Sequence, residues 1–172
     1  MIKRHMGRTL AVLLVLSAVL LGILVPGGPI ETRSFSHISP FILGAFNTFL
    51  TVLGIGSLVL AYCAFKGKRW AILAAAFCGI SYFLVYALDL GMIFPVSSDK
   101  MPPALFGIEV ASLLVSFPLT FLSLRGVSMP VINSESPENQ VALKKSHVLL
   151  LVLMTLAGVG IIIFATMSAM GK

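Results

Sequence analysis

The sequence predicts an all-α integral membrane protein: a bundle of about five transmembrane helices with a cytoplasmic N-terminus and its C-terminus outside. Composition is the first observation behind this class, because 58% of the 172 residues are apolar and only 10% are charged. The mean hydropathy is +1.06, far above the range of water-soluble domains. The apolar residues also fall in blocks long enough to cross a bilayer, which takes roughly 20 residues at a rise of ~1.5 Å each.

Five such blocks define the predicted spans, and none of them has Lys or Arg in its interior. They cover residues 9–25, 41–65, 70–90, 104–124 and 147–169. The connections between them are too short to hold a soluble domain. We therefore predict one transmembrane helical domain over residues 1–172.

The first block has a second interpretation, since a basic start followed by an apolar run is also typical of a signal peptide. Lys3, Arg4 and Arg8 precede the run. The run is longer than a usual signal core, and no small-x-small cleavage motif separates it from Pro26. We expect a retained signal anchor; cleavage would instead leave four helices with both ends outside.

Capping residues mark where the later helices begin. Ser39-Pro40 places an N-cap residue before a proline at the first helical position, where its missing N–H does no harm. Pro102-Pro103 is the equivalent signal for the fourth helix. Trp70 starts the third block, as expected of an amphipathic ring at the membrane interface.

The main cytoplasmic connection is predicted over residues 125–146, because turn-forming residues gather there. Within it, Ser136-Pro137-Glu138 has the pattern of a helix start well before the last apolar block. The last helix is therefore expected to begin in the cytoplasm near Pro137. It would then carry Lys144 and Lys145 at the interface.

Orientation follows from the basic residues, which are concentrated on the cytoplasmic side of membrane proteins. With the N-terminus inside, nine Lys and Arg residues fall in cytoplasmic segments and three fall outside. The nine are Lys3, Arg4, Arg8, Lys66, Lys68, Arg69, Arg125, Lys144 and Lys145, and the three are Arg33, Lys100 and Lys172. The net charge of +6 thus needs no nucleic-acid partner, and contact of the basic residues with anionic lipid head groups at the inner face is the simpler interpretation.

Polar side chains of three predicted helices lie at a similar depth, in the outer third of the membrane. Asp89 stands 19 residues after Trp70, roughly 28 Å along the helix. Glu109 and Asn47 stand about 8 and 10 Å below the starts of their helices. The candidate cluster is Asp89, Glu109, Asn47 and Tyr86 from the helices, with Arg33 and His37 from the loop above, where Glu31 also lies.

Two interpretations of this band stay open. In one, its residues line an outward-facing cavity that binds a small cation or a lipid head group, or that passes protons. In the other, Asp89 ends its helix at the water line. Glu109 then pairs with Arg33 or Lys100, or serves as an acid in the first turns of its helix.

Known catalytic and metal-binding patterns are missing. The sequence has no phosphate-binding glycine loop, no dinucleotide fingerprint and no metalloprotease or serine-hydrolase motif. Cys63 and Cys78 do not form a C-x-x-C pair and are interpreted as buried apolar residues. His5 and His147 have no partner at ligand spacing, so no metal or cofactor is expected.

These absences favour a non-enzymatic protein that acts as an accessory, assembly or regulatory subunit of a larger membrane complex. The small residues Gly54, Gly56, Ala157 and Gly160 offer helix faces where a partner subunit can approach closely. The alternatives are a small transporter or channel that uses Asp89, Glu109 and Asn47, or a lipid-active enzyme. Short loops without an appended domain are typical of a bacterial cytoplasmic membrane protein.

Overall fold

The computed structural model describes residues 2–128 and 145–171. These residues form five helices that are each long and apolar enough to cross a membrane, and they contain no strand. The helices are α1 (Ile2–Ile23), α2 (Pro40–Phe65), α3 (Arg69–Leu90), α4 (Pro103–Ser128) and α5 (Lys145–Ala169). The predicted all-α class, with five helices long and apolar enough to cross a membrane, is confirmed for the described residues.

The helix ends extend beyond the predicted apolar blocks. α1 begins at Ile2 and ends at Ile23, whereas its apolar block covers residues 9–25. α4 continues to Ser128, so residues 125–128 of the predicted loop are helical. The physical reason is that hydropathy marks only the part of a helix that suits lipid, while the hydrogen-bonded helix continues through basic residues. The helical extension from about residue 137 falls among residues 129–144, outside the described residues.

Proline and glycine define the ends of α2. Pro40 is its first residue, and Ser39 takes an extended N-cap conformation (φ −54°, ψ 134°) without a hydrogen bond from its side chain. At the other end, Gly67 has φ of 75°, a left-handed conformation that favours glycine. Its N–H donates to the carbonyl of Ala64 at 2.9 Å. Only two residues, Gly67 and Lys68, then separate the C-cap Lys66 from α3.

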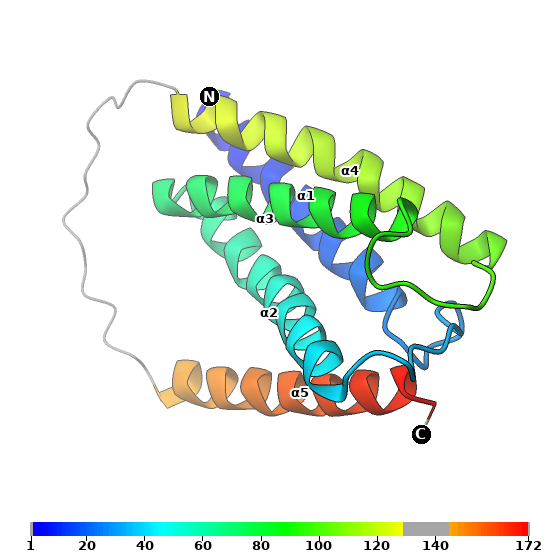
Figure 1. Cartoon of the computed structure of the whole chain (residues 1–172). Coiled ribbons are helices and arrows are strands. Elements are labelled where there is room, and N and C mark those ends of the chain that lie inside the picture. The colour runs from blue at the N-terminus through cyan, green and yellow to red at the C-terminus, as the bar shows by residue number, and fades with distance from the viewer. Residues whose placement is uncertain (1, 129–144, 172) are drawn as a thin grey trace.

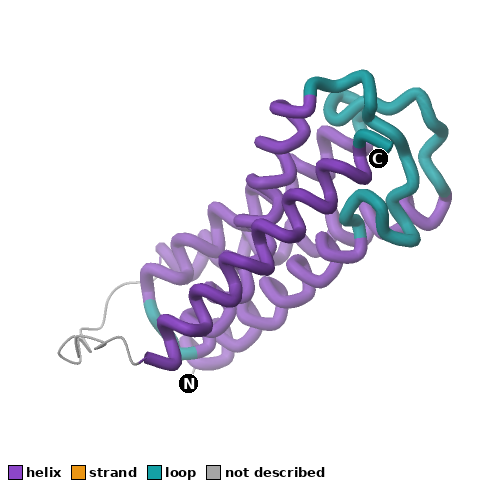
Figure 2. Tube along the Cα trace, turned by 90° about the horizontal axis from the view of Figure 1, so that it is seen from below, coloured by secondary structure: helices purple, strands orange, loops and turns teal. Residues whose placement is uncertain are grey.

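Helices α1 to α4 pack together, with α1 along α2 and α3 along α4. Helix α1 also contacts α3 and α4, and α2 contacts α3. In the described part of the chain α5 contacts one helix only, α2, and it lies apart from α1, α3 and α4 in Figure 1. Figure 2 shows that both long loops and the C-terminus gather at one end of the molecule, opposite the N-terminus.

Small residues allow the helices to approach closely at the end where the N-terminus lies. A Cβ placed on Gly7 of α1 would stand 2.6 Å from the carbonyl oxygen of Ala64 in α2. Ala64, Ala71 and Ala75 are completely buried there. Leu10 of α1, also completely buried, fills the space between them. This half of the bundle is therefore an apolar core packed by close backbone approach.

An apolar groove separates α5 from the bundle. It has a volume of about 220 Å³ and lies between α1, α2 and α5. Its wall is rich in small side chains, namely Ala18, Gly22, Thr51, Gly54 and Ala165. Helix α5 closes one side of the groove by placing Gly158 against Thr51 and Ile55 of α2.

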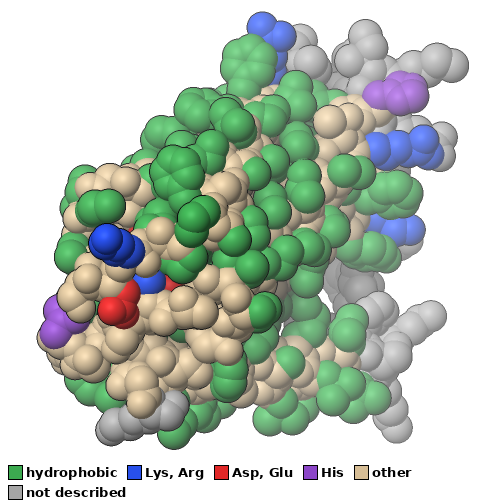
Figure 3. Space-filling view, turned by 90° about the vertical axis from the view of Figure 1, so that its right-hand side faces the viewer, with side chains coloured by type: hydrophobic (Ala, Val, Ile, Leu, Met, Phe, Trp, Pro, Cys, Tyr) green, Lys and Arg blue, Asp and Glu red, His purple; other side chains and the backbone are tan. Residues whose placement is uncertain are grey.

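Charged side chains occupy the two ends of the molecule, and a broad apolar surface lies between them (Figure 3). All acids of the described residues lie at the end that holds the long loops. They are Glu31, Asp89, Asp99 and Glu109. The opposite end carries Arg8, Lys66, Lys68, Arg69 and Arg125.

Candidate functional site

The loop between α1 and α2 folds back over the end of the bundle. Gly27, with φ of 84°, makes the turn, and its N–H donates to the carbonyl of Glu31 at 3.3 Å. Phe35 is buried, and its N–H donates to the carbonyl of Ala169 at the end of α5 (2.7 Å). The loop is thus anchored on both sides of Arg33.

Arg33 first binds a carboxylate of its own loop. Its backbone N–H and its Nε each donate to Oε1 of Glu31 at 3.0 Å, and Nη2 donates to Oε2 at 2.6 Å. Two donors of the guanidinium therefore meet the two oxygens of one carboxylate, a paired geometry available to Arg but not to Lys. The ring of Phe35 lies 5.3 Å from the guanidinium carbon and supports it by a cation–π contact.

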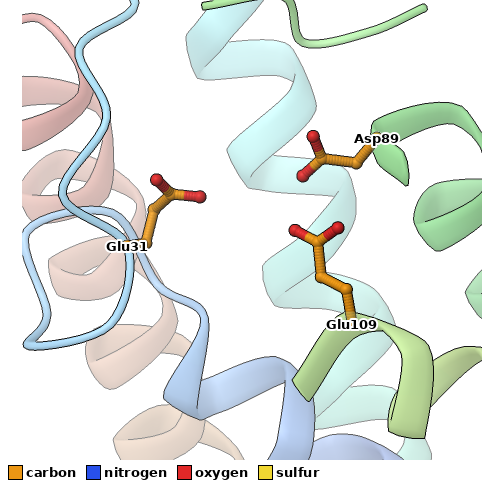
Figure 4. A group of neighbouring side chains, drawn as sticks. All are labelled: Glu31, Asp89 and Glu109. Carbon is orange, nitrogen blue, oxygen red and sulfur yellow. The ribbon is translucent and has the colours of Figure 1, made fainter. Parts of the chain in front are cut away.

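The other edge of the same guanidinium reaches the helices. Nη1 and Nη2 donate to the two oxygens of Asp89 near the end of α3, each at 2.9 Å. Nη2 also lies 3.6 Å from Oε1 of Glu109 in α4. One arginine therefore joins a loop and two helices through three carboxylates, which point toward one another in Figure 4.

Most of the charged side chains in this network are buried, so their charges must be balanced within the protein. Arg33 is 7% exposed, Glu31 5% and Glu109 2%. Burial by itself would lower the pKa of the Arg33 guanidinium, but the hydrogen bonds and charges of Glu31 and Asp89 raise it above its ordinary value. Arg33 therefore stays charged at every pH at which the protein can be studied. If all three carboxyl groups around this guanidinium were ionised, the cluster would have a formal charge of −2.

A cavity of about 50 Å³ lies beside the cluster, on the bundle side. This volume is enough for a few groups of the size of water. Glu31, Asp89, Glu109, Asn47 and Tyr86 supply its polar wall, and the remainder is apolar. Two polar atoms, Oε2 of Glu109 and the hydroxyl of Tyr86, are buried there and make no hydrogen bond of ordinary geometry within the described residues.

Asn47 and Tyr86 are held in place by neighbouring helices. The Asn47 side chain donates from Nδ2 to the hydroxyl of Thr166 in α5 at 3.1 Å. Tyr86 stacks on Tyr82, with ring centroids 6.3 Å apart and planes 8° from parallel. Tyr82 is fixed in turn because its hydroxyl donates to Ser57 of α2 at 3.0 Å.

A second cavity of about 50 Å³ lies on the other side of the Arg33–Asp89 pair. The loop between α3 and α4 forms its outer wall with Pro95, Ser97 and Asp99. Two hydrogen bonds tie this loop to the first: Ser34 N–H donates to Asp99 at 2.8 Å, and the Ser97 hydroxyl donates to the Ser34 carbonyl at 2.8 Å. Arg33 and Asp89 thus stand between an outer and an inner cavity.

The structure brings together five of the six residues in the predicted outer band: Asp89, Glu109, Asn47, Tyr86 and Arg33. His37 is exposed and does not line either cavity. Glu31 was expected in the loop but not within the cluster. The sequence feature that could have indicated this contact is the Glu-x-Arg spacing, in a short loop whose only Lys or Arg is Arg33.

Both expected roles of the acids can be compared with these contacts. Asp89 does more than end its helix at the water line, because Arg33 holds both of its oxygens. Of the two expected partners of Glu109, Arg33 is the one in contact, and Lys100 is exposed. The two cysteines are free thiols in partly buried positions.

Residues 6–142 match a family described as a domain of unknown function (DUF8051). That range contains nearly all of α1, the whole of α2 to α4 and all four residues of the charge network, whereas α5 lies beyond it. No curated protein and no solved structure matches the chain. Because the match spans most of its residues, the chain belongs to the DUF8051 family.

Proposed function

We propose that this protein is a non-enzymatic accessory, assembly or regulatory subunit of a membrane complex, and that a partner helix binds in the groove between α1, α2 and α5. The groove is the observation that carries the proposal. Five small side chains line it, so that the backbone of another helix can come close. In the membrane such packing is a main source of helix association, since lipid provides no hydrophobic driving force.

The small residues noted in the sequence have different places in the structure. Gly54 lines the groove and contacts Leu21 of α1, so it serves the bundle as well as the groove. Ala157 and Gly160 are exposed on α5, and Gly56 has open space around its Cα. Ala157 and Gly160 therefore extend the apolar contact surface beyond the groove.

The packing of the other half of the bundle favours this role over transport. Leu10, Leu14 and Leu119 are completely buried and fill the interior below the charge cluster. On that side an open apolar hollow lies on the surface of α1 and α2, where Val12, Leu16 and Tyr62 line it. A transported ion would need a path through this apolar packing.

We place the protein in a bacterial cytoplasmic membrane with the N-terminus inside and the C-terminus outside. The excess of basic residues at the end with the N-terminus, together with the acids at the other end, supports this orientation. The burial of Leu10 and Leu14 supports retention of the first span as a signal anchor, because its loss would empty the centre of the bundle.

The proposal is tested by filling the groove. Gly22 lines it, and no atom lies within 4 Å of a Cβ added there. Gly22→Leu should therefore keep the fold and exclude the partner helix. Gly107→Leu is the matched control, because Gly107 has equally open surroundings on α4.

The measurement is affinity purification in a mild detergent, followed by identification and quantification of what co-purifies. We expect a stoichiometric membrane protein with the native chain and with Gly107→Leu, and a loss of at least tenfold with Gly22→Leu at unchanged thermal stability. Recovery of lipid alone with the native chain, or equal recovery of a partner with both variants, would contradict the proposal.

A further inference from the structure

The charge network leaves the inner cavity with more negative charge than the protein itself balances. Glu31, Asp89 and Glu109 face a single guanidinium, so the described residues supply one cation for three carboxyl groups. Burying carboxylate charge without a matching cation lowers the stability of the fold. A ligand that brings positive charge into the cavity would remove this cost.

We propose that the inner cavity binds a small divalent cation with a preference for oxygen ligands, of the Ca²⁺ class, through Asp89 and Glu109. The spacing of the acids fits this ion. Ligand oxygens of Glu31, Asp89 and Glu109 all lie within 4.8 Å of one another. Oxygens that share one Ca²⁺ at about 2.4 Å stand no more than about 5 Å apart.

Arg33 leaves coordination capacity on these groups. It contacts Glu109 through Oε1, and Oε2 makes no hydrogen bond of ordinary geometry within the described residues although Asp89 lies beside it, in a side chain that is 2% exposed. Each oxygen of Asp89 accepts one hydrogen bond from Arg33 and retains a second lone pair. Both carboxylates can therefore hold the guanidinium on one side and an ion on the other.

Two neutral groups point to a ligand independently of the acids. The hydroxyl of Tyr86 lines the cavity, is buried and makes no ordinary hydrogen bond there. Asn47 lines the same cavity, and its amide oxygen takes no part in the bond from Nδ2 to Thr166. A phenol and an amide oxygen beside carboxylates form the hard, all-oxygen environment that Ca²⁺ prefers.

The outer cavity provides the approach from outside. It carries Asp99 at its wall and is separated from the inner cavity by the Arg33–Asp89 pair. The guanidinium competes for the same carboxylates and repels an incoming cation. Binding should therefore be weak, with Kd on the order of 10⁻⁴–10⁻³ M as in extracellular calcium modules.

The experiment uses the purified full-length protein in neutral-lipid nanodiscs, where head groups do not compete for the ion. Thermal unfolding is measured with CaCl₂, MgCl₂ or NaCl at equal ionic strength. At about ten times Kd, Ca²⁺ should raise Tm by roughly 3–6 °C. Terbium(III) is a second probe, because its emission is excited through nearby tyrosine rings such as Tyr86.

Glu109→Gln preserves the shape of the side chain and removes its charge. It should lower Ca²⁺ affinity at least tenfold and abolish terbium emission excited through tyrosine. Asp99→Asn is the matched control, since it removes an acid from the outer cavity alone and should retain the Ca²⁺ shift. Tyr86→Phe should weaken Ca²⁺ binding severalfold and keep the fold, which covers the case in which Glu109→Gln does not fold.

The alternative source of neutralising charge is the proton. The proposal fails if Ca²⁺ produces no greater Tm shift than NaCl, or if Glu109→Gln and Tyr86→Phe both keep the full Ca²⁺ shift. It also fails if stability varies with pH while remaining independent of Ca²⁺. These results would not bear on the partner groove, which is tested at Gly22: Gly22 lines the groove and not the inner cavity, although Asn47 lines both.

Discussion

Arg33 is the residue on which the outer end of the molecule depends. Its guanidinium makes paired hydrogen bonds with Glu31 and with Asp89 and lies 3.6 Å from Glu109. A lysine has the charge but not the planar fork that meets two carboxylates at once. The loop above the bundle is therefore attached to α3 and α4 by a single side chain.

Replacing Arg33 by Gln should destabilise the protein by about 3–5 kcal/mol, because two buried carboxyl groups and a partly buried one lose the cation that they share in the described residues. The stability of Arg33→Lys should lie between that of Arg33→Gln and that of the native protein. Thermal or chemical unfolding in detergent, followed by circular dichroism, measures the change. Arg125→Gln is the control, since Arg125 is exposed and makes a cation–π contact with Phe121, 4.2 Å from the ring centroid. Equal stability of Arg33→Gln and the native protein would contradict the stabilising role that we assign to Arg33.

At the level of single residues, the structure brings the four helical residues of the predicted band to one cavity and leaves His37 outside it. Asp89, Glu109, Asn47 and Tyr86 were placed in one band because helical rise converts residue number into height. His37 lies in the loop between α1 and α2 and is exposed. The reason is that loop side chains have no fixed rotation about an axis, so height does not tell which of them turn inward.

Among the helices, α3 and α4 form a contact that depends on one missing side chain. A Cβ on Gly79 would stand 2.5 Å from Oγ1 and 3.0 Å from the backbone nitrogen of Thr120. The backbone atom cannot move without a shift of α4. Gly79 therefore sets the distance between the helices that carry Asp89 and Glu109.

Gly79→Ala should lower the free energy of unfolding by about 1–3 kcal/mol, because it overpacks this contact. Gly56→Ala, where nothing lies within 4 Å of the added Cβ, should be neutral or slightly stabilising. The free energies of unfolding of the two variants, measured in parallel, test this prediction. If the two alanines have the same effect, the close contact between α3 and α4 is not required for stability.

The ends of the helices show what an apolar pattern can and cannot locate. Pro40 and Pro103 were recognised because proline at a first helical position has a stereochemical cause. The start of α1 at Ile2 and the end of α4 at Ser128 were missed. Basic residues continue both helices past the apolar block, and hydrogen bonding within a helix does not depend on hydropathy.

For the whole molecule, orientation in the membrane is the property with the simplest test. In a chain whose Cys63 and Cys78 are replaced by Ala, single cysteines are placed at Lys68 and Lys100, both exposed. A membrane-impermeant maleimide should label Lys100→Cys in intact cells and Lys68→Cys only after permeabilisation. The reverse labelling pattern would show that the N-terminus lies outside.

The number of helices, their approximate positions and the band that holds the polar residues could all be inferred from the sequence. These properties are local, because the free energy of placing a segment in lipid is close to a sum over its own residues. The contacts of Arg33, the isolation of α5 from every helix but α2, and the groove beside Gly22 required the three-dimensional structure. Each depends on how helices are rotated against one another, and a shift of one residue turns a side chain by about 100° around its helix.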